Sequence, residues 1–156
     1  AGAASTPGVG ARLWLPLVVV GLVGQLAWTV ENMYLNLFVY DTITDDPRVL
    51  AAMVAASAVT ATVATLLIGA ASDRARTRRA FIAGGYLLWG IATASFGLVS
   101  VDRAAGLSAT GSAVALAVVT IVLLDCVMSF LGSGANDASF NAWVTDSTVP
   151  ANRGRV

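Results

Sequence analysis

Two acidic side chains lie inside long apolar stretches of the sequence. Glu31 falls in GQLAWTVENMYLNLF, residues 24–38, and Asp125 falls near the middle of the apolar run 112–135. A charged side chain at the centre of a membrane helix costs about 2.5–3.5 kcal/mol on insertion scales, so such a residue has a partner or a function. Asp125 has no basic residue within one helical turn, so it must be protonated, face water or pair with another helix. Either carboxyl group can take up a proton or coordinate a cation.

Polar side chains recur on one face of the helix that would carry Glu31. With about 100° of rotation per residue, four of them fall on a stripe about 60° wide, and Glu31 and Trp28 lie on its flank. The four are Gln25, Thr29, Asn32 and Asn36. Amides hydrogen-bond hydroxyl groups in both directions, and aromatic rings stack on sugar faces, so the stripe favours a water-filled cavity for a polar ligand. Hydrogen bonding between amides of neighbouring membrane helices is the alternative explanation.

A second stripe accompanies Asp125. Asp125, Ser129, Gly132 and Asn136 line up within about 60° on one helical face. The two stripes together predict one site for a substrate or a coupling cation. The predicted site residues are Glu31, Asp125, Gln25, Trp28, Asn32, Asn36 and Ser129.

The composition indicates which elements position these side chains. Of the 156 residues, 57% are hydrophobic and 12% are charged, and the mean hydropathy is +0.79, whereas soluble domains carry about 25% charged residues. Four apolar runs are long enough to cross a hydrocarbon core of about 30 Å, which takes about 20 helical residues. These runs cover residues 13–39, 49–71, 80–101 and 112–135. The predicted fold class is therefore an all-α integral membrane protein embedded in a lipid bilayer, with residues 1–12 as an N-terminal segment and residues 136–156 as a loop.

The arginines predict the orientation of the helices. All nine basic residues are Arg, and the four spans would place seven of them on one side of the membrane and two, Arg48 and Arg103, on the other. The seven are Arg12, Arg74, Arg76, Arg78, Arg79, Arg153 and Arg155. Because arginine-rich loops stay on the cytoplasmic side, we expect both ends of this chain to be cytoplasmic.

The sequence lacks the residues that several classes of function require. It contains no His and one cysteine, Cys126, which excludes an internal disulfide and leaves no credible zinc site. It contains no Lys, and hence no phosphate-binding loop of the P-loop type. A net charge of zero does not suit a nucleic-acid surface. We therefore expect neither an enzyme nor a cofactor, a metal or a nucleic-acid partner.

The stretch GAASDRARTRR, residues 69–79, resembles the signature loop between the second and third helices of the major facilitator superfamily. Gly69, Asp73 and Arg74 match that signature in register, while Arg76 stands where the signature has Gly. The Asp-Arg pair and the Arg-rich turn after it are also similar to the glycoside-pentoside-hexuronide:cation symporter branch, whose usual Trp-Gly within the turn is absent here.

The stretch NDASFNAWVTDSTVPANRGRV, residues 136–156, resembles the connection between helices four and five of bacterial facilitators. Asp146, Pro150 and Arg153-Gly154-Arg155 carry this second resemblance. The fourth-helix Arg that is common in the family is missing, and Asp125 is the charged residue in this region. The departure from the family pattern suits a site based on carboxylates.

The resemblance implies two six-helix halves built from three-helix repeats, with substrate bound near the membrane midplane and moved by alternating access. It also implies a cytoplasmic gate whose ion pairs hold one access state. The gate residues implied are Asp73, Arg74, Arg76, Arg78, Asp137, Asp146, Arg153 and Arg155.

These observations predict the first four helices of a carrier in a bacterial plasma membrane, with the later helices as partners. The expected activity is transport of a small polar solute, a sugar or glycoside as first choice, driven by H⁺ or Na⁺. One alternative is a complete four-helix exporter that dimerises, with Glu31 resembling the single first-helix Glu of small multidrug exporters; the seven-to-two arginine bias disfavours it. Another is a membrane subunit that does not transport, in which neutralising Glu31 and Asp125 has no effect.

Overall fold

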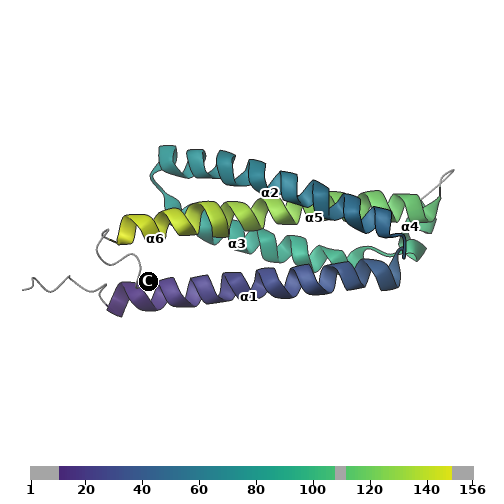
Figure 1. Cartoon of the computed structure of the whole chain (residues 1–156), viewed down its shortest axis with the longest axis horizontal. Coiled ribbons are helices and arrows are strands. Elements are labelled where there is room, and N and C mark those ends of the chain that lie inside the picture. Colours follow the sequence, from purple (N-terminus) through teal and green to yellow (C-terminus); the bar gives the residue numbers. More distant parts are fainter. Residues whose placement is uncertain (1–10, 108–111, 149–156) are drawn as a thin grey trace, which may run out of the picture.

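The computed structural model describes residues 11–107 and 112–148, and the regular structure in those ranges is helical (Figure 1). The long helices are α1 (Ala11–Thr42), α2 (Pro47–Ala75), α3 (Arg78–Ser95) and α5 (Ala113–Gly132). A 3₁₀ turn, η1 (Phe96–Leu98), extends α3, and a short helix, α4 (Val101–Leu107), follows it. A π-helical segment, η2 (Ser133–Phe140), joins α5 to α6 (Asn141–Ser147) without a break.

Four helical stretches in the described ranges are long and apolar enough to cross a membrane. They are Trp14–Thr42, Pro47–Ala75, Arg78–Leu98 and Ala113–Ser147. Their outer faces carry large apolar side chains, such as Met33, Leu66 and Leu87, which are 63%, 70% and 66% exposed. In water, apolar faces of this kind would cause the protein to associate. In a bilayer they contact the hydrocarbon chains of the lipids. The prediction of an all-α membrane protein is confirmed.

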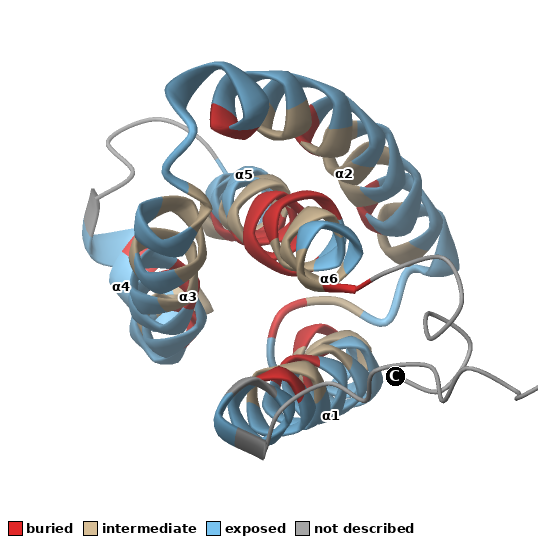
Figure 2. Ribbon diagram, turned by 90° about the vertical axis from the view of Figure 1, so that its left-hand side faces the viewer, coloured by how far each residue is buried: buried red, intermediate tan, exposed pale blue. Residues whose placement is uncertain are grey.

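The continuous helix α5–η2–α6 forms the centre of the bundle. It packs between α2 and α3, while α1 lies at the edge and makes fewer contacts (Figure 2). Glycines allow the backbones to approach closely: a Cβ atom on Gly85 would lie 2.6 Å from Ala135 Cβ, and one on Gly134 would lie 2.9 Å from Ile68 Cγ1. Because lipid provides no hydrophobic drive between helices, such close packing supplies the attraction.

The fourth span ends later than its hydropathy predicts. The polarity of residues 136–156 predicts a loop, but the helix continues to Ser147. Asn136 and Ser139 are buried, and both have partners: the Tyr86 hydroxyl lies 3.0 Å from Asn136 Oδ1, and Ser139 Oγ donates to the Gly134 carbonyl oxygen at 2.9 Å. These bonds satisfy polar groups inside the bundle, so the helix extends past the point where its apolar run ends. The stretch 102–111, which the predicted third and fourth spans leave between them, likewise contains most of α4.

Local sequence signals fix several helix ends. Asp46 caps α2, because its Oδ1 accepts a hydrogen bond from the Arg48 backbone N–H at 2.9 Å, and Pro47 occupies the first position. The Ser112 side chain caps α5 in the same way through the N–H of Ala115 at 3.4 Å. Arg76 caps the C-terminal end of α2 and has φ 52° and ψ 25°. This left-handed conformation is the one that Gly adopts without steric cost.

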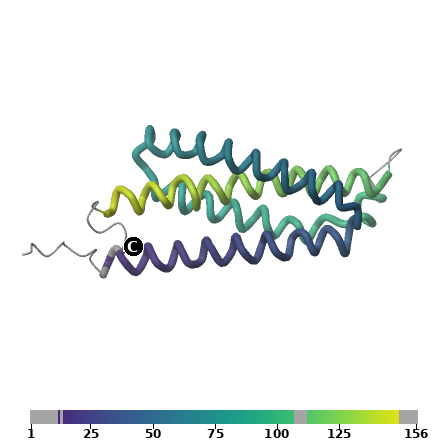
Figure 3. Tube along the Cα trace, viewed as in Figure 1, coloured from purple at the N-terminus to yellow at the C-terminus, as the bar shows by residue number. Residues whose placement is uncertain are grey.

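Successive long helices run in alternating directions (Figure 3), so the described arginines gather at two ends of the bundle. One end, called the arginine-rich end below, holds Arg12, Arg74, Arg76, Arg78 and Arg79. Arg48 and Arg103 lie at the opposite end. Arg153 and Arg155 lie outside the described residues.

Candidate functional site

Glu31 points from α1 into the bundle, where α3 supplies its hydrogen-bond partners. Its Oε2 accepts a bond from the indole Nε1 of Trp89 at 2.7 Å, and its Oε1 lies 2.7 Å from the Thr93 hydroxyl oxygen. Trp89 and Thr93 are one helical turn apart, so the same face of α3 presents both. Glu31 is 9% exposed and forms no ion pair with an arginine in the described part of the chain. It is a buried acid held by neutral donors.

The Thr93 hydroxyl can donate its proton to either of two acceptors, and the charge of Glu31 decides which one. Its oxygen lies 2.7 Å from Glu31 Oε1 and 2.9 Å from the carbonyl oxygen of Trp89. A hydroxyl has one proton to donate. When that proton goes to Glu31, the carboxylate accepts two hydrogen bonds; when it goes to the backbone carbonyl, a protonated Glu31 donates to Thr93. The same geometry therefore accommodates both charge states of Glu31.

Asp125 lies on the buried face of α5 and is 4% exposed. The Ser57 hydroxyl of α2, which donates to the Val54 carbonyl oxygen at 3.1 Å, lies beside the carboxyl group of Asp125. Glu31 lies near enough for the two acids to interact electrostatically. Ser129, one turn further along α5, is also buried.

Two further aromatic rings pack against Trp89, whose indole donates to Glu31. Trp28 and Trp89 meet edge to face with their centroids 6.2 Å apart, and the rings of Tyr86 and Trp89 have centroids 5.6 Å apart. Edge-to-face pairs of this kind add about 0.5–1.5 kcal/mol beyond the burial of their area. The cluster fixes the Trp89 indole in the orientation that donates to Glu31.

The Tyr86 hydroxyl connects three elements of the bundle. It lies 3.0 Å from Asn136 Oδ1 of η2 and 3.4 Å from the carbonyl oxygen of Val20 on α1. Gly24 leaves room for this contact, because a Cβ atom there would collide with the Tyr86 hydroxyl and lie 2.5 Å from Asn136 Oδ1. The π-helical turn that presents Asn136 is a feature found frequently at functional sites.

The amide stripe of α1 does not converge on Glu31. Gln25 and Asn32 are exposed and Asn36 is half-buried. The Nδ2 of Asn32 donates to the Trp28 carbonyl oxygen at 2.8 Å, and that of Asn36 donates to the Asn32 carbonyl oxygen at 3.0 Å. The structure thus separates two groups of predicted residues. Glu31, Trp28, Asp125 and Ser129 face the interior, and Gln25, Asn32 and Asn36 lie on another face of α1.

At the arginine-rich end, Arg78 bridges two carboxylates. Its guanidinium lies 2.8 Å from Asp73, near the end of α2, and 2.5 Å from Asp146 of α6. The Arg78 side chain is 20% exposed, while those of Asp73 and Asp146 are 63% and 56% exposed. The three residues tie α2, α3 and α6 together.

The other predicted gate residues stand apart from this cluster. Arg74 and Arg76 are exposed and form no ion pair within the described part of the chain. Asp137 accepts a hydrogen bond from Asn136 Nδ2 at 3.2 Å instead of pairing with an arginine. Arg153 and Arg155 lie outside the described residues. Of the predicted gate residues that the structure describes, Arg78, Asp73 and Asp146 are the ones joined by ion pairs.

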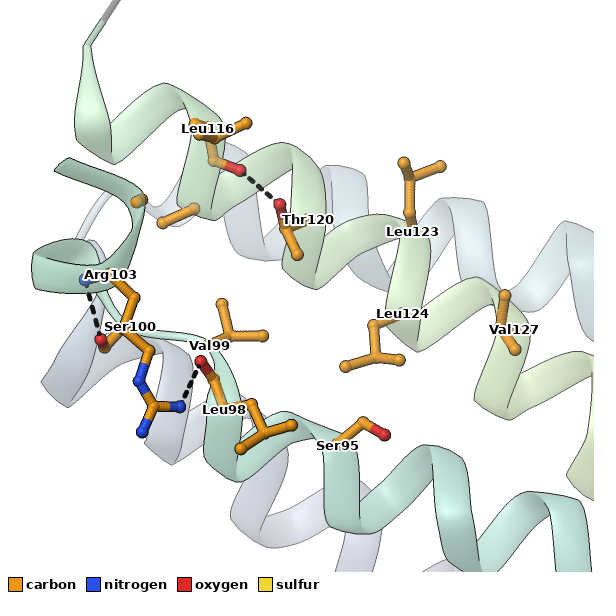
Figure 4. Close-up of a pocket in the computed structure, with 12 residues that line it drawn as sticks. Ser95, Leu98, Val99, Ser100, Arg103, Leu116, Thr120, Leu123, Leu124 and Val127 are labelled. Atoms are coloured by element: carbon orange, nitrogen blue, oxygen red, sulfur yellow. Dashed lines mark hydrogen bonds between the residues drawn. The ribbon is translucent and has the colours of Figure 1, made fainter. Parts of the chain in front are cut away.

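A cavity of about 530 Å³ opens between α3 and α5 at the opposite end of the bundle (Figure 4). Apolar side chains, including Leu98, Leu124 and Val127, form most of its wall. The Arg103 guanidinium at this cavity already has a hydrogen-bond partner, since it donates to the Leu98 carbonyl oxygen at 2.8 Å. None of the predicted site residues lines this cavity, and its apolar wall does not suit a polar solute.

Reasoning from the sequence missed Trp89, Thr93 and Ser57, the partners of the two acids. The signal for the first two was an indole N–H and a hydroxyl one turn apart on an apolar helix. Helical periodicity shows that Trp89 and Thr93 share one face of their helix, but it does not show which other helix packs against that face.

Among the described residues, no three acidic or cysteine side chains gather as a metal site. Comparison of the chain with protein-family models, with curated protein sequences and with solved structures gave no match. The class that the fold defines is an all-α membrane protein with four helices able to span a bilayer.

Proposed function

We propose that the chain forms helices one to four of a facilitator-like secondary transporter in a bacterial plasma membrane, with its arginine-rich end in the cytoplasm. The proposed substrate is a small polar solute, first a sugar or glycoside, and the driving ion is H⁺ or Na⁺. Glu31 and Asp125 serve as the coupling acids, and Arg78 with Asp73 and Asp146 serves as the inner gate.

The observation that carries this proposal is the environment of Glu31. A buried acid in a membrane helix is costly, and here neutral donors from α3 compensate it. A buried acid needs hydrogen-bond donors or an opposite charge to offset its desolvation, and the donors found here are neutral. An acid that takes up and releases an ion during a transport cycle needs partners that fit both of its charge states, which Thr93 provides.

The exposed amide face of α1 supports the same proposal. Gln25 and Asn32 lie on the surface of the described bundle. Asn32 and Asn36 donate to carbonyl oxygens of their own helix, but their remaining amide groups would be unsatisfied against lipid, so this face suits a water-filled path or a second part of a carrier. Glu31 and the stripe belong to the same helix, α1, although they lie on different faces of it.

Transport by the full gene product tests the proposal. The protein is reconstituted in liposomes that contain the pH indicator pyranine, and monosaccharides and disaccharides are added outside, with and without Na⁺. Sugar-dependent acidification of the lumen, or sugar uptake that depends on a Na⁺ gradient, is the expected result. Glu31→Gln and Asp125→Asn should abolish the gradient-driven uptake.

Asp102→Asn is the matched control, because Asp102 is an exposed acid at the opposite end of the bundle. It should transport like the wild type. Unchanged coupling in both Glu31→Gln and Asp125→Asn would remove the acids from the mechanism. Efflux of a cationic dye such as ethidium by residues 1–156 alone, lost in Glu31→Gln, would instead identify the four-helix exporter.

A further inference from the structure

A groove between α1 and α3 opens at the arginine-rich end. It has a volume of about 580 Å³, and its wall includes Val19 and Val23 of α1 and Ile82 of α3. Arg12 and Arg79 also line it, from the first turns of the same two helices, together with Trp143 of α6. Guanidinium groups at one end and aliphatic side chains beyond them give the groove an amphipathic character.

The length of the groove matches one leaflet of a bilayer. At about 1.5 Å of rise per residue, Arg12 and Val23 are about 16 Å apart along α1. Half of a hydrocarbon core is about 15 Å thick. A lipid whose headgroup lies at the arginines would therefore place an acyl chain along the whole apolar wall.

The charge at the mouth of the groove is positive. Arg12 and Arg79 are both exposed, and neither forms an ion pair within the described part of the chain. The neighbouring acids Asp73 and Asp146 are paired with Arg78. Two free guanidinium groups on adjacent helices match a phosphate, which accepts charge-assisted hydrogen bonds from both.

We propose that this groove binds one anionic phospholipid. Its phosphate lies between Arg12 and Arg79, one acyl chain follows the valines of α1, and Trp143 lies at the level of the headgroup, where Trp is enriched in membrane proteins. A soluble phosphate compound would leave the apolar wall uncovered, so the occupant is a lipid. The site does not depend on the proposed transport function.

Native mass spectrometry of the full chain in detergent tests the proposal. The protein is titrated with palmitoyl-oleoyl phosphatidylglycerol and, separately, with the phosphatidylcholine of the same acyl chains. We expect one phosphatidylglycerol per chain to be retained in preference to phosphatidylcholine. Arg12→Gln and Arg79→Gln should each weaken that binding about fivefold, since a basic residue near a membrane surface contributes about 1 kcal/mol.

Matched variants separate this groove from general attraction to the basic end. Arg74→Gln removes an exposed arginine from the same end but outside the groove, and it should keep wild-type binding. Ala83→Trp fills the groove and should abolish retention, while Ala94→Trp, on the exposed surface of α3 outside it, should not. Each of these positions is exposed, so circular dichroism should show unchanged helicity.

Three results of the lipid titrations would overturn the proposal. They are equal retention of the two lipids by the wild type, unchanged retention of phosphatidylglycerol in the Arg12→Gln/Arg79→Gln double variant, and equal losses in Arg74→Gln and Arg79→Gln. Displacement of the lipid by millimolar glycerol 3-phosphate would show a soluble phosphate site and would also contradict it.

Discussion

The indole nitrogen of Trp89 lies 2.7 Å from Oε2 of Glu31, across 58 positions of sequence. With the Thr93 contact and the Tyr86 contact to Val20, it forms a set of polar links between α3 and α1. α1 lies at the edge of the bundle and packs less closely than the other long helices. These links therefore hold the helix that carries the buried acid.

Replacing Trp89 by Phe should destabilise the bundle by about 1–3 kcal/mol, because it leaves a buried carboxyl without one of its donors while keeping most of the ring packing. The measurement is thermal unfolding in detergent. Trp28→Phe is the matched control, since Trp28 contacts the same ring and its indole makes no side-chain hydrogen bond among the described residues. An equal loss of stability in Trp89→Phe and Trp28→Phe would show that ring packing, and not the hydrogen bond to Glu31, causes the effect.

Gly24→Ala should lower the free energy of unfolding by about 1–3 kcal/mol, the usual range for overpacking a tight interface. The new Cβ atom meets the Tyr86 hydroxyl and Asn136 Oδ1. Removing that hydroxyl relieves part of the clash, so the Ala substitution should cost less in a Tyr86→Phe background. Gly90→Ala, where a Cβ atom meets nothing within 4 Å, should be neutral or stabilising. Additive effects of Gly24→Ala and Tyr86→Phe in denaturation curves would contradict this contact.

Arg76→Gly should stabilise the chain by about 1 kcal/mol, since Gly adopts the left-handed conformation of Arg76 without steric cost. Arg74→Gly, two residues earlier and inside α2, should destabilise by a similar amount through lost helix propensity. Both positions are exposed arginines at the same end, so the charge change is matched. A change of the same sign in both variants would show that charge, not backbone conformation, determines the effect.

The Arg78 cluster should contribute little to stability. Its two acids are more than half exposed, so double-mutant cycles of Arg78→Gln with Asp73→Asn or Asp146→Asn should give coupling energies of about 0–1 kcal/mol each. The coupling should fall in 1 M salt, where the Debye length is about 3 Å. A coupling energy that is large and insensitive to salt would show that water does not reach the cluster when the protein is in the membrane.

Cysteine labelling should place the arginine-rich end in the cytoplasm. In a Cys126→Ser background, which removes the single cysteine, Asp45→Cys should react with a membrane-impermeant maleimide in intact cells. Thr77→Cys, in the turn between α2 and α3, should react only after permeabilisation. The reverse pattern would contradict the orientation, and labelling of both positions in intact cells would indicate a mixed topology.

Much of the fold and part of the site are predictable from the sequence. Spans and helix caps follow from local composition, as the Asp46-Pro47 start of α2 illustrates. The cost of placing an acid inside an apolar span identifies Glu31 and Asp125 from their sequence positions alone. The end of the fourth span is not predictable in this way, because Asn136 remains helical through its contact with Tyr86, 50 positions away.

The sequence by itself determined the class of protein, the four apolar helices of the described ranges that are long enough to span a bilayer, and the division of the described arginines between two ends. Hydropathy, capping and charge determine these features, and each acts within a single helix or at its ends. Only the tertiary structure decided that Glu31 faces Trp89 and Thr93, that Gln25 and Asn32 face outward, and that Arg78 joins two acids. The rotation of each helix about its own axis depends on close packing between segments distant in sequence, and no single helix encodes it.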